Sequence, residues 1–282
     1  MMRKTIAGLM GCLLLTATAA RAEHKLLITD VLDAKQIEGQ ATFEYARTQQ
    51  SFDAAFIGGG RGITNTTESR YSLGAGLGYG LEVTASIPYV FSESTKVEFN
   101  NPFLEPEYEK KDGFGDFSFG AKYGILEEKK KAPVSLVAGV DVKFETGGRN
   151  TPGTGTTDVS PYLAVSKKVG HHVIPYAAYR ATIRNHGAED SHTLSLGSEN
   201  EINETVTIDA RVDAVFNTAT NELSSFEIYD LELSSYVQLF HNFYVIPAVT
   251  LATGSTAHTK DIDIHFGSPF EVKAGASLYY LF

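Results

Sequence analysis

Few residues in this sequence have the types and spacing that chemistry requires. Asp190, Ser191 and His192 hold the groups of a hydrolytic triad, namely a carboxylate, a hydroxyl and an imidazole. Adjacent side chains of an extended strand point to opposite faces, so Ser191 and His192 should not meet. No lipase-like motif surrounds them. We therefore predict that the chain is not an enzyme.

A second group could bind a metal ion. If the segment around residue 260 extends as a strand, Asp261, Asp263 and His265 share one face, with His258 nearby. Such clusters are common in solvated loops, which is the interpretation we favour. Cys12 is the single cysteine, and the Gly-rich stretch 147–156 lacks the strand-to-helix context of a phosphate site. We expect no metal and no cofactor.

Most other ionisable residues recur at every second position of segments that read as strands. In 205–217, for example, Asp209, Arg211 and Asp213 alternate with apolar residues. A period of two is typical of a β-strand with one apolar and one polar face. About 12 segments show it, at approximately 37–48, 66–78, 80–92, 114–126, 134–146, 157–168, 172–184, 191–200, 205–217, 226–239, 243–253 and 268–282.

The last segment indicates the fold. From Phe270 to Phe282 every second residue is uncharged and mostly apolar, and the chain ends on an aromatic residue with Tyr280 two positions before it. This is typical of the final strand of an outer-membrane barrel. We predict an all-β transmembrane, antiparallel, up-and-down β-barrel of about 12 strands that spans residues 36–282. Tyr280 and Phe282 would be the signal for the barrel assembly machinery.

The connections between the segments support a membrane barrel over a soluble sandwich. Long and short connections alternate, as they do between extracellular loops and periplasmic turns. Aromatic residues, drawn from 14 Tyr and 17 Phe with no Trp, cluster near the strand ends, as in the two girdles that flank a bilayer. The long connections are 49–65, 93–113, 147–156, 185–190, 218–225 and 254–267.

The N-terminus predicts export. Arg3 and Lys4 precede an apolar stretch, and Ala20 and Ala22 form a small-x-small cleavage site, so residues 1–22 read as a cleaved signal peptide. The peptide would take the chain through the inner membrane of a Gram-negative bacterium to the outer membrane and its lipid. Residues 23–35 precede the first strand and include several aliphatic side chains. We expect this lead-in to dock at the periplasmic mouth as a plug; a frayed tail is the alternative.

Two stretches resemble a known family. Leu27-Ile28-Thr29-Asp30 opens the mature chain, and Asp112-Gly113-Phe114-Gly115-Asp116 leads into Gly120-Ala121-Lys122-Tyr123 in its middle. Together they are similar to the outer-membrane transporter family named for the meta-pathway of phenol degradation. Val31 stands where the opening motif would carry a second Asp. The resemblance implies a porin-like barrel that passes small hydrophobic or aromatic compounds.

The polar face of the strands would line the lumen. An excess of acids there argues against an anion channel and favours a narrow, weakly cation-preferring pore. The net charge of −10 also argues against nucleic acid as a partner. We predict passive uptake of a small solute that the sequence does not identify; the alternative is a structural or surface-interaction barrel with a closed lumen. The candidate lumen-lining residues are Asp116, Lys122, Asp141, Lys143, Glu145, Arg180, Asp209, Arg211, Asp213, Asp230, Glu232, Glu271 and Lys273.

Overall fold

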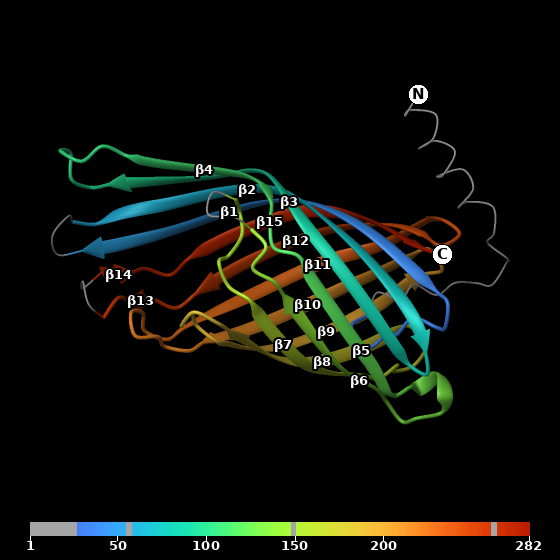
Figure 1. Cartoon of the computed structure of the whole chain (residues 1–282). Coiled ribbons are helices and arrows are strands. Elements are labelled where there is room, and N and C mark those ends of the chain that lie inside the picture. Colours follow the sequence, from blue (N-terminus) through green and yellow to red (C-terminus); the bar gives the residue numbers. More distant parts are fainter. Residues whose placement is uncertain (1–26, 55–57, 148–150, 261–263) are drawn as a thin grey trace.

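The strands wind into one closed, tilted barrel, which a computed structural model describes for residues 27–54, 58–147, 151–260 and 264–282 (Figure 1). The predicted signal peptide lies outside the described residues. Both ends of the described chain lie at one end of the barrel, which we call the turn end; the opposite end is the loop end. Among the described residues, no helix is long and apolar enough to cross a bilayer.

The barrel wall has 12 antiparallel strands, as predicted, when β4 and β5 are counted as one strand that is interrupted at residues 115–117. The wall is closed by β1, which pairs with β2 on one side and with β15 on the other. Its strands are β1 Ile37–Ala54, β2 Gly60–Gly78, β3 Leu81–Phe99, β4 Glu107–Phe114, β5 Ser118–Leu126, β6 Ser135–Lys143, β7 Asp158–Ser166, β8 Val173–Arg184, β9 Ser191–Asn203, β10 Val206–Asn217, β11 Phe226–Phe240, β12 Phe243–Gly254 and β15 Phe270–Leu281.

The two faces of the wall follow the alternation in the sequence. In β10, Ile208, Val212 and Phe216 are exposed on the outside, whereas Asp209 on the opposite face is buried. In the closed part of the wall each strand is paired on both sides, whereas β4, above it, pairs with β3 alone among the described strands. The outer apolar band of the closed part is what lipid requires. The exposed aliphatic and aromatic residues of the other strands continue this band around the barrel.

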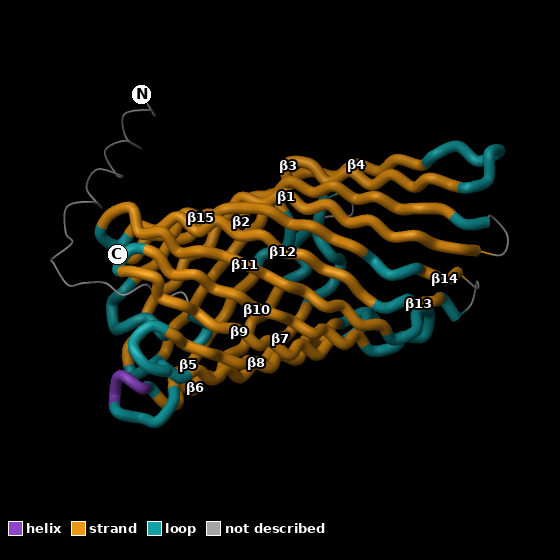
Figure 2. The backbone as a smooth tube through the Cα atoms, turned by 180° about the vertical axis from the view of Figure 1, so that it is seen from behind, coloured by secondary structure: helices purple, strands orange, loops and turns teal. Residues whose placement is uncertain are grey.

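The wall is taller on one side than the sequence predicts. Residues 49–65 and 93–113, which we expected to be loops, are mostly strand, because β1 to β4 continue past the barrel rim as a projecting sheet (Figure 2). The extensions are rich in Thr, Ser and charged residues and lack a continuous apolar face, so the hydrophobic pattern does not reveal them. Two short strands from the last long connection, β13 Ala257–His258 and β14 Ile264–Phe266, join this sheet through β1.

Candidate functional site: the barrel lumen

The lead-in enters the lumen at the turn end. Leu27, Thr29 and Leu32 are all buried there. The hydroxyls of Thr29 and Ser166 are 2.6 Å apart, and the backbone N–H of Lys35 donates to the carbonyl of Gly76 at 2.9 Å. Residues 23–26 lie outside the described residues. The described part of the lead-in is therefore bonded to β7 on one side of the barrel and to β2 on another.

An apolar cluster holds the middle of the lead-in. Leu32, 2% exposed, packs with Tyr244 and Ile246 of β12 and with Tyr279 and Leu281 of β15. A side chain at Gly76 of β2 would collide with the Asp33 and Leu32 carbonyls, so glycine permits the close approach of the lead-in. The inward face at the turn end is thus apolar where the lead-in lies, unlike the rest of the lumen.

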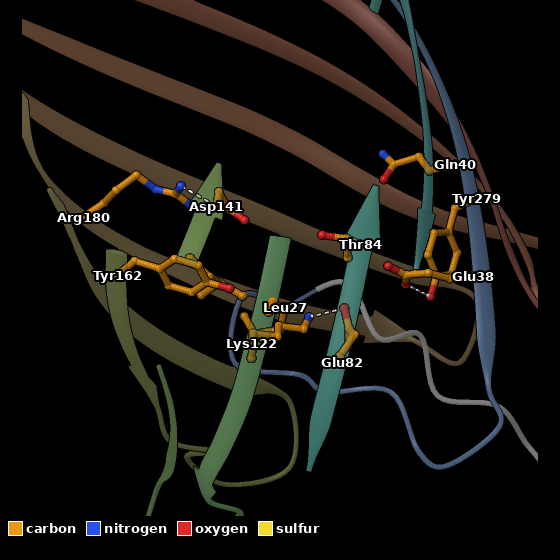
Figure 3. Close-up of a pocket in the computed structure, with 12 residues that line it drawn as sticks. Leu27, Glu38, Gln40, Glu82, Thr84, Lys122, Asp141, Tyr162, Arg180 and Tyr279 are labelled. Atoms are coloured by element: carbon orange, nitrogen blue, oxygen red, sulfur yellow. Dashed lines mark hydrogen bonds and ion pairs between the residues drawn. The ribbon is translucent and has the colours of Figure 1, made fainter. Parts of the chain in front are cut away.

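Next to this cluster, Glu82 of β3 joins the lead-in to the wall. Its carboxylate accepts a hydrogen bond from the backbone N–H of Leu32 at 2.8 Å and lies 3.0 Å from the Lys122 ammonium of β5. Nearby, the Tyr279 hydroxyl donates to Glu38 of β1 at 2.9 Å. Figure 3 shows Glu82 with Lys122 and Glu38 with Tyr279. Glu82 is 1% exposed, so its charge depends on Lys122 for compensation.

The lead-in does not fill the lumen. Beside it lies a cavity of about 200 Å³ whose wall includes Lys122, Tyr162, Arg180 and Leu27 (Figure 3). A second space, of about 400 Å³, is lined by Arg70 and by serine and threonine side chains of β1, β2, β3 and β5. Both spaces border on Gln40, Thr84 and Asp141, so they adjoin.

One side of the cavity is built across three strands. Asp141 of β6 and Arg180 of β8 form an ion pair at 2.5 Å, and the Arg180 guanidinium lies 4.7 Å from the ring centre of Tyr162 on β7 between them. Gly120 of β5 has no side chain, and a Cβ there would collide with Asp141 and Thr84. The glycine thus leaves room for the Asp141 side chain on the neighbouring strand.

The other predicted lining residues form paired groups along the lumen. Arg211 bonds Asp213 at 3.0 Å and Glu232 at 2.9 Å, whereas Lys273 lies 3.0 Å from Glu271. Lys143 lies 2.8 Å from Asp158. Asp209 accepts a hydrogen bond from Tyr176 at 3.1 Å, and Asp230 directly faces Asp213 across β10 and β11. Like charges directly opposite each other repel, and Arg211 beside Asp213 offsets part of that repulsion.

Two predicted lining residues instead lie at the loop end, outside the strands. Asp116 accepts hydrogen bonds from the backbone N–H groups of Thr146, Gly147 and Thr154. Burial tends to raise the pKa of Asp116, but these hydrogen bonds outweigh it and hold the pKa below its usual value. Glu145 lies 3.3 Å from the His186 ring. Asp116 thus holds Thr146, Gly147 and Thr154 in place rather than pairing with a base.

Four further residues on inward positions are not among those predicted from the sequence, namely Glu38, Tyr162, Tyr176 and Glu199. Glu199 is 2% exposed and faces Asp209 across the β9–β10 pair. Glu38 shares the face of Glu44, and Tyr162 shares that of Asp158, so strand parity alone would have placed them. Their burial could not be foreseen, because it arises from the lead-in and from large side chains of other strands.

The groups considered for catalysis and metal binding are placed as follows. Ser191 is buried on the inner face of β9, whereas His192 lies on the outer face, 2.7 Å from the Tyr179 hydroxyl. Asp261 and Asp263 lie outside the described residues. In the part of the chain that the structure describes, no three His, Cys, Asp or Glu side chains are arranged to hold a metal ion.

Comparisons with known proteins agree with this architecture. Residues 46–173 match the model of the family described as "Putative MetA-pathway of phenol degradation". This match confirms the resemblance over residues 46–173, which include the stretch from Asp112 to Tyr123, whereas the opening stretch Leu27-Ile28-Thr29-Asp30 lies outside the matched region. The matched region runs from β1 into β8 and includes one wall of the cavity. No curated protein matches the sequence.

A solved outer-membrane channel shares the fold. The COG4313 outer membrane channel from Pseudomonas putida F1 is similar over 92% of this chain and 100% of its own, with 12% identity and a TM-score of 0.62. The KdgM porin (13% identity, TM-score 0.45, 84% of this chain and 97% of its own) and the NanC porin (12%, 0.46, 83% and 98%) are more distant. The first similarity confirms the predicted outer-membrane barrel fold.

Proposed function

We propose that this protein is an outer-membrane channel for the passive entry of small solutes. The observation that carries the proposal is the pair of adjoining spaces, of about 200 and 400 Å³, beside the lead-in. A lumen of about 12 strands lies between small barrels that side chains fill and porins with an open channel, so unfilled, polar space at its centre fits a narrow path for small solutes. The fold and the family resemblance point the same way.

The lining narrows the class of solute. The resemblance implies hydrophobic or aromatic compounds, yet the larger space is bordered by Gln40, Thr42, Ser72, Ser86 and other polar groups. A pure hydrocarbon would leave these groups without hydrogen-bond partners, which is costly. An aromatic compound that carries a hydroxyl or carbonyl group fits better, since it can exchange hydrogen bonds with the wall as it passes.

In this proposal the lead-in is a plug. Its contacts through Thr29, Leu32 and Lys35 hold it in the mouth that we assign to the periplasm. Ions and small molecules pass beside it or after its displacement. The excess of acids on the inner face, with Asp213 and Asp230 directly opposed, favours cations over anions.

The alternative is a structural or surface-interaction barrel with a closed lumen. It is favoured by the lead-in, which is tightly packed, and by the projecting sheet of β1 to β4, which could meet a partner outside the cell. In that case the spaces beside the lead-in would hold only water. We place the protein in the outer membrane in either case, with lipid and the barrel assembly machinery as partners.

Uptake of a labelled hydroxylated aromatic compound separates the two functions. A deletion strain should take up the compound more slowly than the parent, and the intact gene should restore the rate. A strain that carries the Gly120→Ala protein, in which Asp141 must move into the lumen, should be slower than one that carries Gly39→Ala, whose added methyl group faces only ordinary contacts. Equal uptake by the parent and the deletion strain would favour the closed barrel.

A further inference from the structure

Four basic residues stand on the outer face of the barrel at its loop end, on neighbouring strands. They are Arg47 of β1, Arg61 of β2, Lys96 of β3 and Lys110 of β4. Arg47 has the parity of Phe43 and Tyr45, which are exposed on the outside. The Tyr45 hydroxyl donates to Asn65 on β2, which places that residue on the outer face as well.

The strand register sets two of these bases in one row. Arg47 faces Asn65, Asn65 faces Ser94, and Ser94 faces Lys110, so the row runs Arg47, Asn65, Ser94, Lys110 across four strands. Three strand spacings separate its ends, about 14 Å. In the next row, Ile63 faces Lys96, whose ammonium lies 5.7 Å from the ring centre of Tyr108. We call Arg47, Arg61, Lys96 and Lys110 the basic patch.

The pairing of β1 with β15 shows at which height along the barrel the basic patch lies. Arg47 is paired with Val272, and Gln49 one outward row higher is paired with Phe270, an exposed aromatic residue at the loop end of the lipid-facing band. Below the patch, Phe43, Tyr45 and Phe114 are exposed aromatic residues of the same wall. The patch therefore stands at the upper edge of the band, at the height of lipid headgroups.

Two charges of the patch have no acid to neutralise them. Arg61 and Lys96 share Glu98, at 2.6 Å each. Arg47 and Lys110 are exposed, and neither forms an ion pair with any residue that the structure describes. The other acids on this outer face of the described strands are Asp53 of β1 and Asp112 of β4, and neither forms an ion pair with these bases. The patch is therefore cationic although the chain as a whole carries a net charge of −10.

No other part of the described wall carries exposed, unpaired bases on its outer face. The Lys and Arg residues of β5 to β15, such as Lys122, Arg211 and Lys273, lie on inward positions, where they pair with acids. Exposed, unpaired bases beside lipid are unfavourable unless an anion meets them. Their confinement to one side and one height indicates an anionic ligand at that place.

We propose that the basic patch binds the phosphate groups of lipids in the outer leaflet, of which lipopolysaccharide is the phosphorylated glycolipid. Arg47 and Lys110 donate charge-assisted hydrogen bonds to phosphate oxygens, and Asn65 and Ser94 between them add neutral donors. The aromatic residues below contact the acyl chains next to the headgroup. The site anchors the barrel at a fixed depth and orientation beneath the projecting sheet.

Native mass spectrometry of the detergent-solubilised, folded protein tests the proposal with bisphosphorylated lipid A as the probe. The wild-type protein should retain the lipid, and Arg47→Gln with Lys110→Gln should bind it about tenfold more weakly, since each base near an anionic headgroup contributes a few-fold in affinity. The matched control is Lys130→Gln with Lys131→Gln at the turn end, which removes the same charge and should bind as the wild type does. Arg47→Lys with Lys110→Arg should retain binding.

Two results would overturn the proposal. One is equal lipid binding by the wild type and by the Arg47→Gln, Lys110→Gln protein, with both shown to be folded by their heat-dependent migration in gels. The other is displacement of the lipid by millimolar inorganic phosphate, which would mean that the patch binds free phosphate rather than a lipid headgroup. Weaker binding of monophosphorylated lipid A than of the bisphosphorylated form would support the role of phosphate.

Discussion

Glu82 and Lys122 face each other across β3 and β5, with their charged atoms 3.0 Å apart and Glu82 almost completely buried. The contact has the geometry of an ion pair rather than of a directed hydrogen bond, since Glu82 Oε1 has no hydrogen-bond partner while Oε2 accepts from Leu32. One carboxylate thus neutralises a lumen base and fastens the lead-in.

Replacing Glu82 with Ala should both destabilise the barrel and loosen the lead-in. Lys122 would be left as a largely buried, unpaired charge, which costs about 3 kcal/mol. The folded fraction should melt at a lower temperature in gel-shift assays, and current recordings should show more frequent opening. Glu109→Gln on β4, where the carboxylate is mostly exposed, is the control and should change neither. A Glu82→Ala protein that opens as rarely as the wild type would contradict the proposal that Glu82 holds the lead-in in place.

Gly120→Ala should narrow the lumen. The added Cβ would collide with Asp141 and Thr84, so Asp141 must move away from residue 120 into the lumen. We expect a lower single-channel conductance than in the Gly39→Ala protein, because Gly39 has room for a methyl group. Conductances that are equal in the two proteins would mean that ions do not pass this point.

The loop residues that Asp116 holds, Thr146, Gly147 and Thr154, should be released at acidic pH. The pKa of Asp116 is lowered in the folded protein, so its contribution to holding the loop is complete above the unfolded value of about 4 and is lost as the pH falls through the lower folded value. Asp116→Asn should release the loop at neutral pH too. Protease cleavage within the loop, followed against pH, checks this. Cleavage of the wild type that is equally slow at pH 7 and well below pH 4 would refute it.

Phe282→Asp should impair assembly. The Phe282 backbone N–H closes the barrel by donating to Ile37 at 2.7 Å, and its ring packs on Tyr280 with centroids 4.5 Å apart. A charge at this position would face the lipid boundary and would remove the aromatic end group that we expect the assembly machinery to recognise. The yield of folded protein in outer-membrane fractions is the measurement, and Phe103→Asp, in an exposed connection, is the control. Equal yields would rule out the signal.

The sequence predicted the wall well and the interior less well. In strands such as β10, apolar outward residues alternate with mostly polar inward residues. The ends of these strands were therefore predicted to within a few residues. The upper parts of β1 to β3 are polar on both faces. Hydrogen bonds between these strands stabilise them there, rather than contact with lipid, so the hydrophobic pattern does not predict them. The ion pair between Asp141 and Arg180 skips a strand, and the place of Leu32 depends on side chains from β12 and β15. Such contacts form only when the barrel closes, so the pattern of residues within a single strand does not predict them.

Single-channel current recorded from the pure protein in planar bilayers tests the central claim most directly. We predict discrete conductance steps and a weak preference of the current for cations. Deleting residues 24–34, which are the lead-in without its first and last residue, should give steps of higher conductance or longer open times. The Glu109→Gln protein should match the wild type. A protein that is folded but shows no steps, either intact or after the deletion, would contradict the account and leave a closed barrel.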